Sequence, residues 1–167
     1  MPTHPRAVLA GVVAMSLGGF VAFISAGQLL MLGLQHVFLE AMPRTHGDEF
    51  FRALIESMTG VMVVDMPAFV LLGATMLWQG NRLRQGGRDS ASWIIALAFV
   101  AMGLLAVYGR DSMVGPMRLF EQVRNPFLPF EPHTWSQISL VGGGVMMLVP
   151  LLAVVILAWR ARVTSDG

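Results

Sequence analysis

One stretch of the sequence decides the fold class: AVLAGVVAMSLGGFVAFISAGQLLMLGLQHVFL, residues 7–39. Its 33 residues include no Asp, Glu, Lys or Arg. A helix that crosses the hydrocarbon core of a bilayer needs about 20 predominantly apolar residues. The stretch therefore predicts a membrane-spanning helix that continues beyond the bilayer, with His36 and Glu40 on the projecting end. It is also far longer than the apolar core of a secretory signal peptide, which indicates a retained anchor.

The composition of the whole chain agrees with a membrane protein. Of its 167 residues, 55% are hydrophobic and 13% are charged, whereas soluble domains carry about 25% charged residues. The length predicts a single domain. The absence of cysteine excludes disulfides, thiolate metal sites and iron–sulfur clusters. The net charge of +1 gives no sign of a nucleic-acid partner.

Four apolar segments are long enough to cross a bilayer: residues 7–35, 59–79, 91–109 and 136–159. They predict an all-α integral membrane bundle that occupies residues 1–167 as one transmembrane domain. Gly18, Ala22 and Ala26 recur at four-residue spacing in the first segment, which predicts a close helix–helix contact. Pro67 and Pro150 fall inside the second and fourth segments, where each removes a backbone donor.

Arginine sets the predicted orientation. Six arginines fall on one side of the membrane, three of them in the short link between the second and third spans: Arg6, Arg82, Arg84, Arg88, Arg160 and Arg162. Cytoplasmic loops carry an excess of Lys and Arg, so we expect both termini to be cytoplasmic. Trp78, Trp93 and Trp159 fall at the same predicted interface. A bacterial inner membrane is the expected location, and an organellar membrane fits the sequence as well.

The outer side is predicted to carry two further features. Residues 47–56 alternate apolar and charged side chains at helical spacing, which predicts a short amphipathic helix. This helix would lie on the membrane surface or extend the second span, and the sequence leaves both alternatives open. The loop from Arg110 to Trp135 contains three prolines spaced three residues apart, Pro126, Pro129 and Pro132. This spacing favours an extended path over that part of the loop.

Asp65 is the ionisable residue placed deepest in a predicted span. A carboxylate at the centre of a transmembrane helix costs about 2.5–3.5 kcal/mol on insertion scales, so we expect Asp65 to face protein and to have a partner. One interpretation is a catalytic acid or base, a proton relay or a metal ligand. The structural alternatives are an ion pair with Arg110 at the outer end of the third span, or a protonated acid that donates to a backbone carbonyl left unpaired by Pro67.

His36 and Glu40 are four residues apart and so share one helical face. Ser25 and Gln28 extend a thin polar stripe along the same side. Together with Asp65, the pair would form a catalytic or transition-metal site with nitrogen and oxygen ligands. The alternative is a solvated pair in the headgroup region. Haem b is disfavoured, because only His36 lies near a span and His133 falls in the outer loop.

The order of these features resembles a known family. Met42-Pro43-Arg44 follows the long first span, Asp48-Glu49-Phe50-Phe51 precedes a proline-containing second span, and Gly115-Pro116-Met117-Arg118 precedes a fourth span led by Trp135. This arrangement resembles the small four-helix membrane proteins related to anthrone oxygenase. The resemblance implies a four-helix membrane fold and an oxygenase type of activity on a hydrophobic substrate.

Two functions follow as hypotheses. The first is a non-catalytic accessory subunit of a larger membrane complex, with the bilayer and other membrane subunits as its partners. The second is a small membrane oxidoreductase that acts on a hydrophobic substrate at an outer-leaflet site of His36, Glu40 and Asp65, with a transition metal as its conceivable cofactor. A channel or transporter is disfavoured, because the spans lack the polar lining of a pore.

Overall fold

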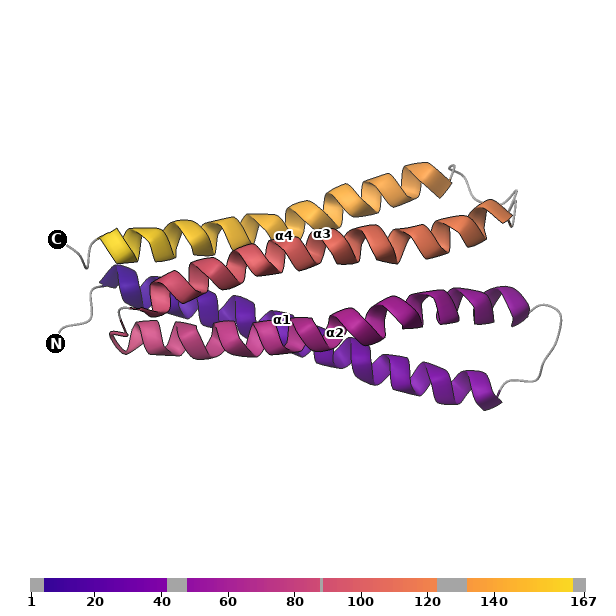
Figure 1. Cartoon of the computed structure of the whole chain (residues 1–167), viewed down its shortest axis with the longest axis horizontal. Helices are drawn as coiled ribbons and strands as arrows, with labels where there is room; N and C mark the ends of the chain where they lie inside the picture. The colour runs from indigo at the N-terminus through magenta and orange to yellow at the C-terminus, as the bar shows by residue number, and fades with distance from the viewer. Residues whose placement is uncertain (1–4, 42–47, 88, 123–131, 164–167) are drawn as a thin grey trace.

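Four long helices make up the part of the chain that the computed structural model describes, residues 5–41, 48–87, 89–122 and 132–163. They are α1 (Pro5–Ala41), α2 (Asp48–Arg84), α3 (Ser90–Gln122) and α4 (Pro132–Val163). Successive helices run antiparallel in an elongated bundle, and both chain ends lie at the same end of it (Figure 1). We call this the terminal end, and the opposite end, near residues 41, 48, 122 and 132, the distal end.

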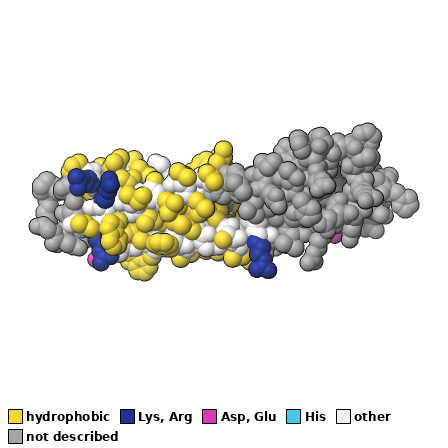
Figure 2. Space-filling model, turned by 90° about the horizontal axis from the view of Figure 1, so that it is seen from above, with side chains coloured by type: hydrophobic (Ala, Val, Ile, Leu, Met, Phe, Trp, Pro, Cys, Tyr) yellow, Lys and Arg dark blue, Asp and Glu magenta, His cyan; other side chains and the backbone are white. Residues whose placement is uncertain are grey.

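Each helix contains a segment that is long and apolar enough to cross a membrane: Pro5–Val37, Met62–Arg84, Ser90–Arg110 and Val145–Val163. This confirms the predicted all-helical bundle with four membrane helices. α1 has 37 residues, which is about 55 Å at 1.5 Å per residue and exceeds the hydrocarbon core of about 30 Å. Apolar side chains cover much of the described surface (Figure 2), as contact with lipid requires.

The structure bears on two features predicted for the outer side, and for residues 48–56 it gives the second of the two alternatives, an extension of the second span. Residues 48–56 are the first turns of α2, continuous with its membrane span, so they extend that helix. Residues 111–122, which were expected in a loop, are the last turns of α3. Both segments are too polar to partition into lipid, but a helix satisfies its own backbone donors and acceptors in water as well. Pro126 and Pro129 lie outside the described residues, and Pro132 begins α4.

Glycine brings α1 and α2 into backbone contact. A Cβ atom added to Gly18 would lie 2.6 Å from the carbonyl oxygen of Gly73, and one added to Gly73 would lie 2.6 Å from that of Gly18. Gly11 and Gly80 form a second reciprocal pair, at 2.6 and 2.7 Å. The pairs are seven residues apart on each helix, two helical turns, which is the repeat of left-handed antiparallel packing.

The small-residue stripe predicted on the first span is therefore confirmed over part of its length. Gly18 and Ala22 both meet Gly73, since the Cβ of Ala22 would lie 3.0 Å from a Cβ added at Gly73. Ala26, one turn further along α1, is exposed. The contact through small residues is thus shown only as far as Ala22. Ser25, the next position of the seven-residue repeat, is still buried, and the two ribbons diverge toward the distal end (Figure 1).

The hydrophobic core formed by the described side chains lies in the terminal half of the bundle. Its fully buried members come from all four helices, and seven of the thirteen are alanine: Ala10, Ala14, Leu72, Met76, Leu83, Ala91, Ile94, Ala98, Ala101, Leu151, Val154, Ala158 and Ala161. Lipid tails are as apolar as the core, so transmembrane helices associate through close van der Waals packing rather than through burial from water. The alanines allow that close approach.

A three-residue turn closes α2. Gly86 has a φ of 93°, a left-handed conformation that glycine adopts without steric cost. The amide of Gly87 donates to the carbonyl of Arg82 at 2.9 Å, and that of Gly86 donates to Leu83 at 3.1 Å. These are the two hydrogen bonds of a Schellman C-cap, which satisfies carbonyls that the helix end would otherwise leave unpaired. The turn holds α3 antiparallel to α2.

We expect Gly18→Ala to destabilise the bundle strongly, because its Cβ would meet the Gly73 backbone, which cannot move aside as a flexible side chain would. Overpacking of this kind costs about 1–3 kcal/mol or more. Thermal unfolding in detergent, followed by circular dichroism, measures the change. Gly27→Ala is the matched control, since open space surrounds that position and alanine favours a helix by about 1 kcal/mol. Equal melting temperatures for the two variants would contradict the prediction.

Gln79 gives a second prediction. Its side chain is 6% exposed, and its Oε1 has no hydrogen-bond partner among the described residues. An unsatisfied buried polar atom costs about 1–3 kcal/mol, so we expect Gln79→Met, which is similar in length and apolar, to raise the melting temperature. Gln85→Met, at an exposed position just after the same helix, should leave it unchanged. A lower melting temperature for Gln79→Met would show that Oε1 has a partner.

Candidate functional site

His36 and Glu40 lie together near the distal end of α1. His36 Nε2 is 3.6 Å from Glu40 Oε1, and both side chains are 72% exposed. The spacing of four residues places them on one face of the helix, as predicted. An exposed pair of this kind contributes little to stability, because water competes for both groups. The geometry fits a solvated pair and leaves both side chains accessible to a partner.

Asp65 lies on α2, two residues before Pro67, and is half-buried. Its carboxylate interacts electrostatically with Tyr108 of α3. Tyr108 is therefore the neighbour that the structure gives to Asp65, and the ion pair with Arg110, whose side chain is exposed, stays a prediction. Both residues lie within the membrane-spanning segments of their helices.

The structure brings His36 and Glu40 into contact. Among the described residues, no group of three or more His, Asp or Glu is placed so that it could hold a metal ion. A site that joins His36, Glu40 and Asp65 thus stays a hypothesis from the sequence. His46 lies outside the described residues, and so does the side chain of His133 in the first turn of α4.

A cavity of about 120 Å³ lies inside the bundle, next to the core. All four helices contribute to its lining, for example Leu17 of α1, Met76 of α2, Ala101 of α3 and Leu151 of α4. We call it the bundle cavity. Its walls are mostly apolar. Apolar cavities of similar size, about 150 Å³, stay dry in soluble proteins and bind molecules such as benzene.

Three polar side chains interrupt the apolar lining of the bundle cavity: Ser25, Gln28 and Tyr108. Ser25 is 5% exposed. The Tyr108 ring meets Phe69 edge to face, with centroids 5.9 Å apart and an interplanar angle of 84°. Such contacts fix the orientation of an aromatic ring. The cavity therefore offers an apolar volume with hydroxyl and amide groups on its lining, and Asp65 acts on one of those hydroxyls.

Sequence reasoning identified part of this site. Ser25 and Gln28 belong to the polar stripe predicted on the first span, and Asp65 was the buried acid. Tyr108 was missed, although it is the only tyrosine in the chain and stands inside an apolar run. A phenol at such a position needs a hydrogen-bonding or polar neighbour, which is the signal that could have linked it to Asp65.

No protein-family model matches the chain, and searches of curated proteins and of solved structures find no match. The resemblance to the anthrone oxygenase family thus stays a prediction from the order of motifs.

Proposed function

We propose that this chain is a non-catalytic membrane subunit of a larger membrane complex, to which it contributes helix packing from its distal half. The supporting observation is a contrast among its glycines. Gly11, Gly18, Gly73 and Gly80 contact a neighbouring helix. Among the described glycines, five have no atom within 4 Å of an added Cβ: Gly27, Gly33, Gly60, Gly103 and Gly109. The first three lie in the distal halves of α1 and α2.

Glycine in these open positions has no benefit for the isolated chain. It costs about 1 kcal/mol relative to alanine in a helix interior, and lipid accommodates any apolar side chain at such a position. Small residues are instead enriched where one transmembrane helix approaches another. The same residue type already serves that purpose at Gly18 and Gly73. The open glycines are therefore suited to contact with helices of another chain.

The proposed orientation follows the arginines. Arg82 and Arg84 lie in the last turn of α2, and Arg160 and Arg162 in the last turn of α4, all at the terminal end. The positive-inside rule assigns this end to the cytoplasm. The distal halves of α1 and α2, with the exposed His36 and Glu40, then lie toward the outer side of the membrane, where they supply polar contacts to the partner subunits.

The decisive experiment is extraction of the chain from its own membranes in mild detergent, followed by measurement of its native mass. We expect it to migrate with larger partners. Gly27→Leu combined with Gly33→Leu should release the chain from the complex without unfolding it, because these positions touch nothing within the chain. Ala96→Leu, at an exposed position of α3 in the terminal half, is the matched control and should stay in the complex.

A wild-type chain that migrates alone, or as a small homo-oligomer, would end the subunit proposal. Equal release by the glycine double variant and by Ala96→Leu would mean that the open glycines are not the contact surface. Circular dichroism of each extracted variant separates loss of the partner from loss of the fold.

The bundle cavity favours a second candidate function, a membrane oxidoreductase that acts on a small hydrophobic molecule. Its apolar volume would hold the molecule, and the Tyr108 hydroxyl beside Asp65 would bind a polar group on it. His36 and Glu40, the outer pair of the sequence hypothesis, do not line the bundle cavity and would lie on its distal side.

Ligand binding tests this second candidate. We expect phenol to raise the melting temperature of the wild-type chain, because a ligand that binds only the folded state stabilises it. Ala101→Leu, which places extra carbon atoms in the bundle cavity, should abolish the effect. Ala96→Leu adds the same atoms to an exposed position on the same helix and should retain it. Equal stabilisation of both variants would exclude binding in the cavity.

A further inference from the structure

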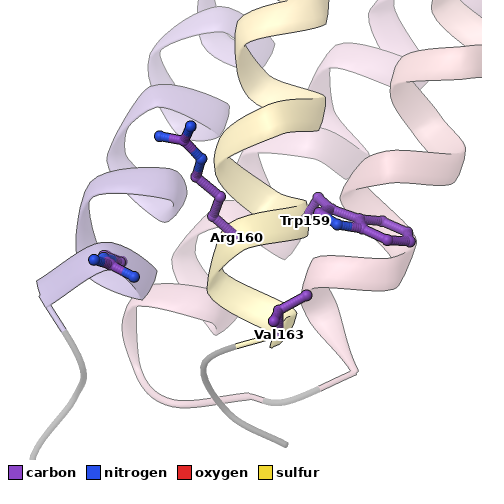
Figure 3. A pocket seen from close by; sticks show the side chains of 4 residues that line it. Trp159, Arg160 and Val163 are labelled. Carbon is purple, nitrogen blue, oxygen red and sulfur yellow. The ribbon is translucent and has the colours of Figure 1, made fainter.

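A pocket of about 450 Å³ lies at the terminal end of the bundle, away from the bundle cavity. Four side chains line it: Arg6 in the first turn of α1, and Trp159, Arg160 and Val163 in the last turns of α4. Figure 3 shows Arg160 extending from α4 toward α1, while Trp159 and Val163 lie on the other side of α4. We call it the arginine pocket. Its lining residues come from the beginning of α1 and the end of α4.

The arginine pocket is electropositive. Two guanidinium groups from different helices face it, and the first turn of α1 adds the positive end of a 37-residue helix. Arg160 also makes an interaction within the chain, but a guanidinium has five N–H donors, which leaves donors for a second partner. The other described charges at this end are Arg82, Arg84, Arg162 and Asp89, so the field stays positive.

The depth of the arginine pocket matches the lipid headgroups. The spans of α1 and α4 end at Pro5 and Val163, the residues beside it. Trp159 is 58% exposed, and indoles prefer the interface between hydrocarbon and water. Trp78 and Trp93 are also exposed near the terminal ends of α2 and α3. Figure 2 shows arginine side chains at this end set among apolar ones.

We infer that the arginine pocket binds the headgroup phosphate of an anionic phospholipid. Arg6 and Arg160 supply charge-assisted hydrogen bonds to the phosphate oxygens. Trp159 and Val163 also line the pocket, across α4 from Arg160, and offer apolar surface to the first acyl carbons. Toward the middle of the membrane, α1 and α4 expose apolar side chains along which the acyl chains extend, among them Leu9, Val12 and Ile156. Basic pockets between transmembrane helices bind lipid headgroups in this manner.

Inorganic phosphate shares the charged group but not the acyl chains. The apolar surface and the position at the end of the membrane spans favour the lipid, because a site for a free anion needs neither. The inference is independent of the proposed subunit role, since none of the open glycines lines the arginine pocket.

Native mass spectrometry of the detergent-solubilised full chain tests the inference. Phosphatidylglycerol is titrated, phosphatidylcholine serves as the zwitterionic lipid, and inorganic phosphate serves as the competitor. We expect Arg6→Gln combined with Arg160→Gln to weaken phosphatidylglycerol binding about 10- to 30-fold, on the basis of about one unit charge lost at each of two sites near the surface. Arg82→Gln is the matched control: it removes the same charge at the same end, from a residue stacked on Trp78 at 5.1 Å and outside the pocket.

Each other outcome overturns the inference. Unchanged binding by the double variant means that the lipid sits elsewhere, and an equal loss in Arg82→Gln means that only the total charge of this end matters. Displacement of the lipid by millimolar phosphate means that the pocket is a site for small anions. Both variants are compared with the wild-type chain by circular dichroism, so that a loss of fold is recognised as such.

Discussion

Backbone contact between α1 and α2 is the constraint on which the rest of the bundle depends. Gly18 meets Gly73 and Gly11 meets Gly80, and any side chain at these positions would push the helices apart. In a bilayer, where burial gives no advantage over lipid, helix association relies on such close packing. The glycine pairs fix both the antiparallel register of the two helices and the region in which the remaining helices can pack around them.

That region is the terminal half of the bundle, and the difference between the terminal and distal halves follows from it. The alanine-rich core and the short turn through Gly86 both lie there. Beyond Ala22 the helices have no further close glycine contact among the described residues. Ser25 of α1 and Met66 and Phe69 of α2 are still buried there, and from Ala26 to Ala41 the described side chains of α1 are exposed or half-buried. The bundle cavity lies at the transition between the two halves, where packing from four helices no longer fills the interior.

Much of this arrangement could be predicted from the sequence. The four spans follow from apolar runs, since partition into lipid depends on composition alone. The helix ends were harder, because Arg110 and Asp111 end a hydropathic run without ending α3. The two roles of glycine could not be predicted, because Gly18 and Gly27 have similar apolar neighbours. Only the placement of α2 decides which one is in contact, and the pairing of Asp65 with Tyr108 likewise depends on the packing of α2 and α3.

The position of the glycine pairs has a consequence for the order of assembly. Both pairs join the first two helices of the chain, so their contact is complete once residues 5–84 have been synthesised. A hairpin of α1 and α2 can therefore form in the membrane before the synthesis of α3 and α4 is complete. The later helices then pack on an existing pair. Assembly of the bundle therefore requires only that the α3–α4 hairpin docks on the α1–α2 hairpin.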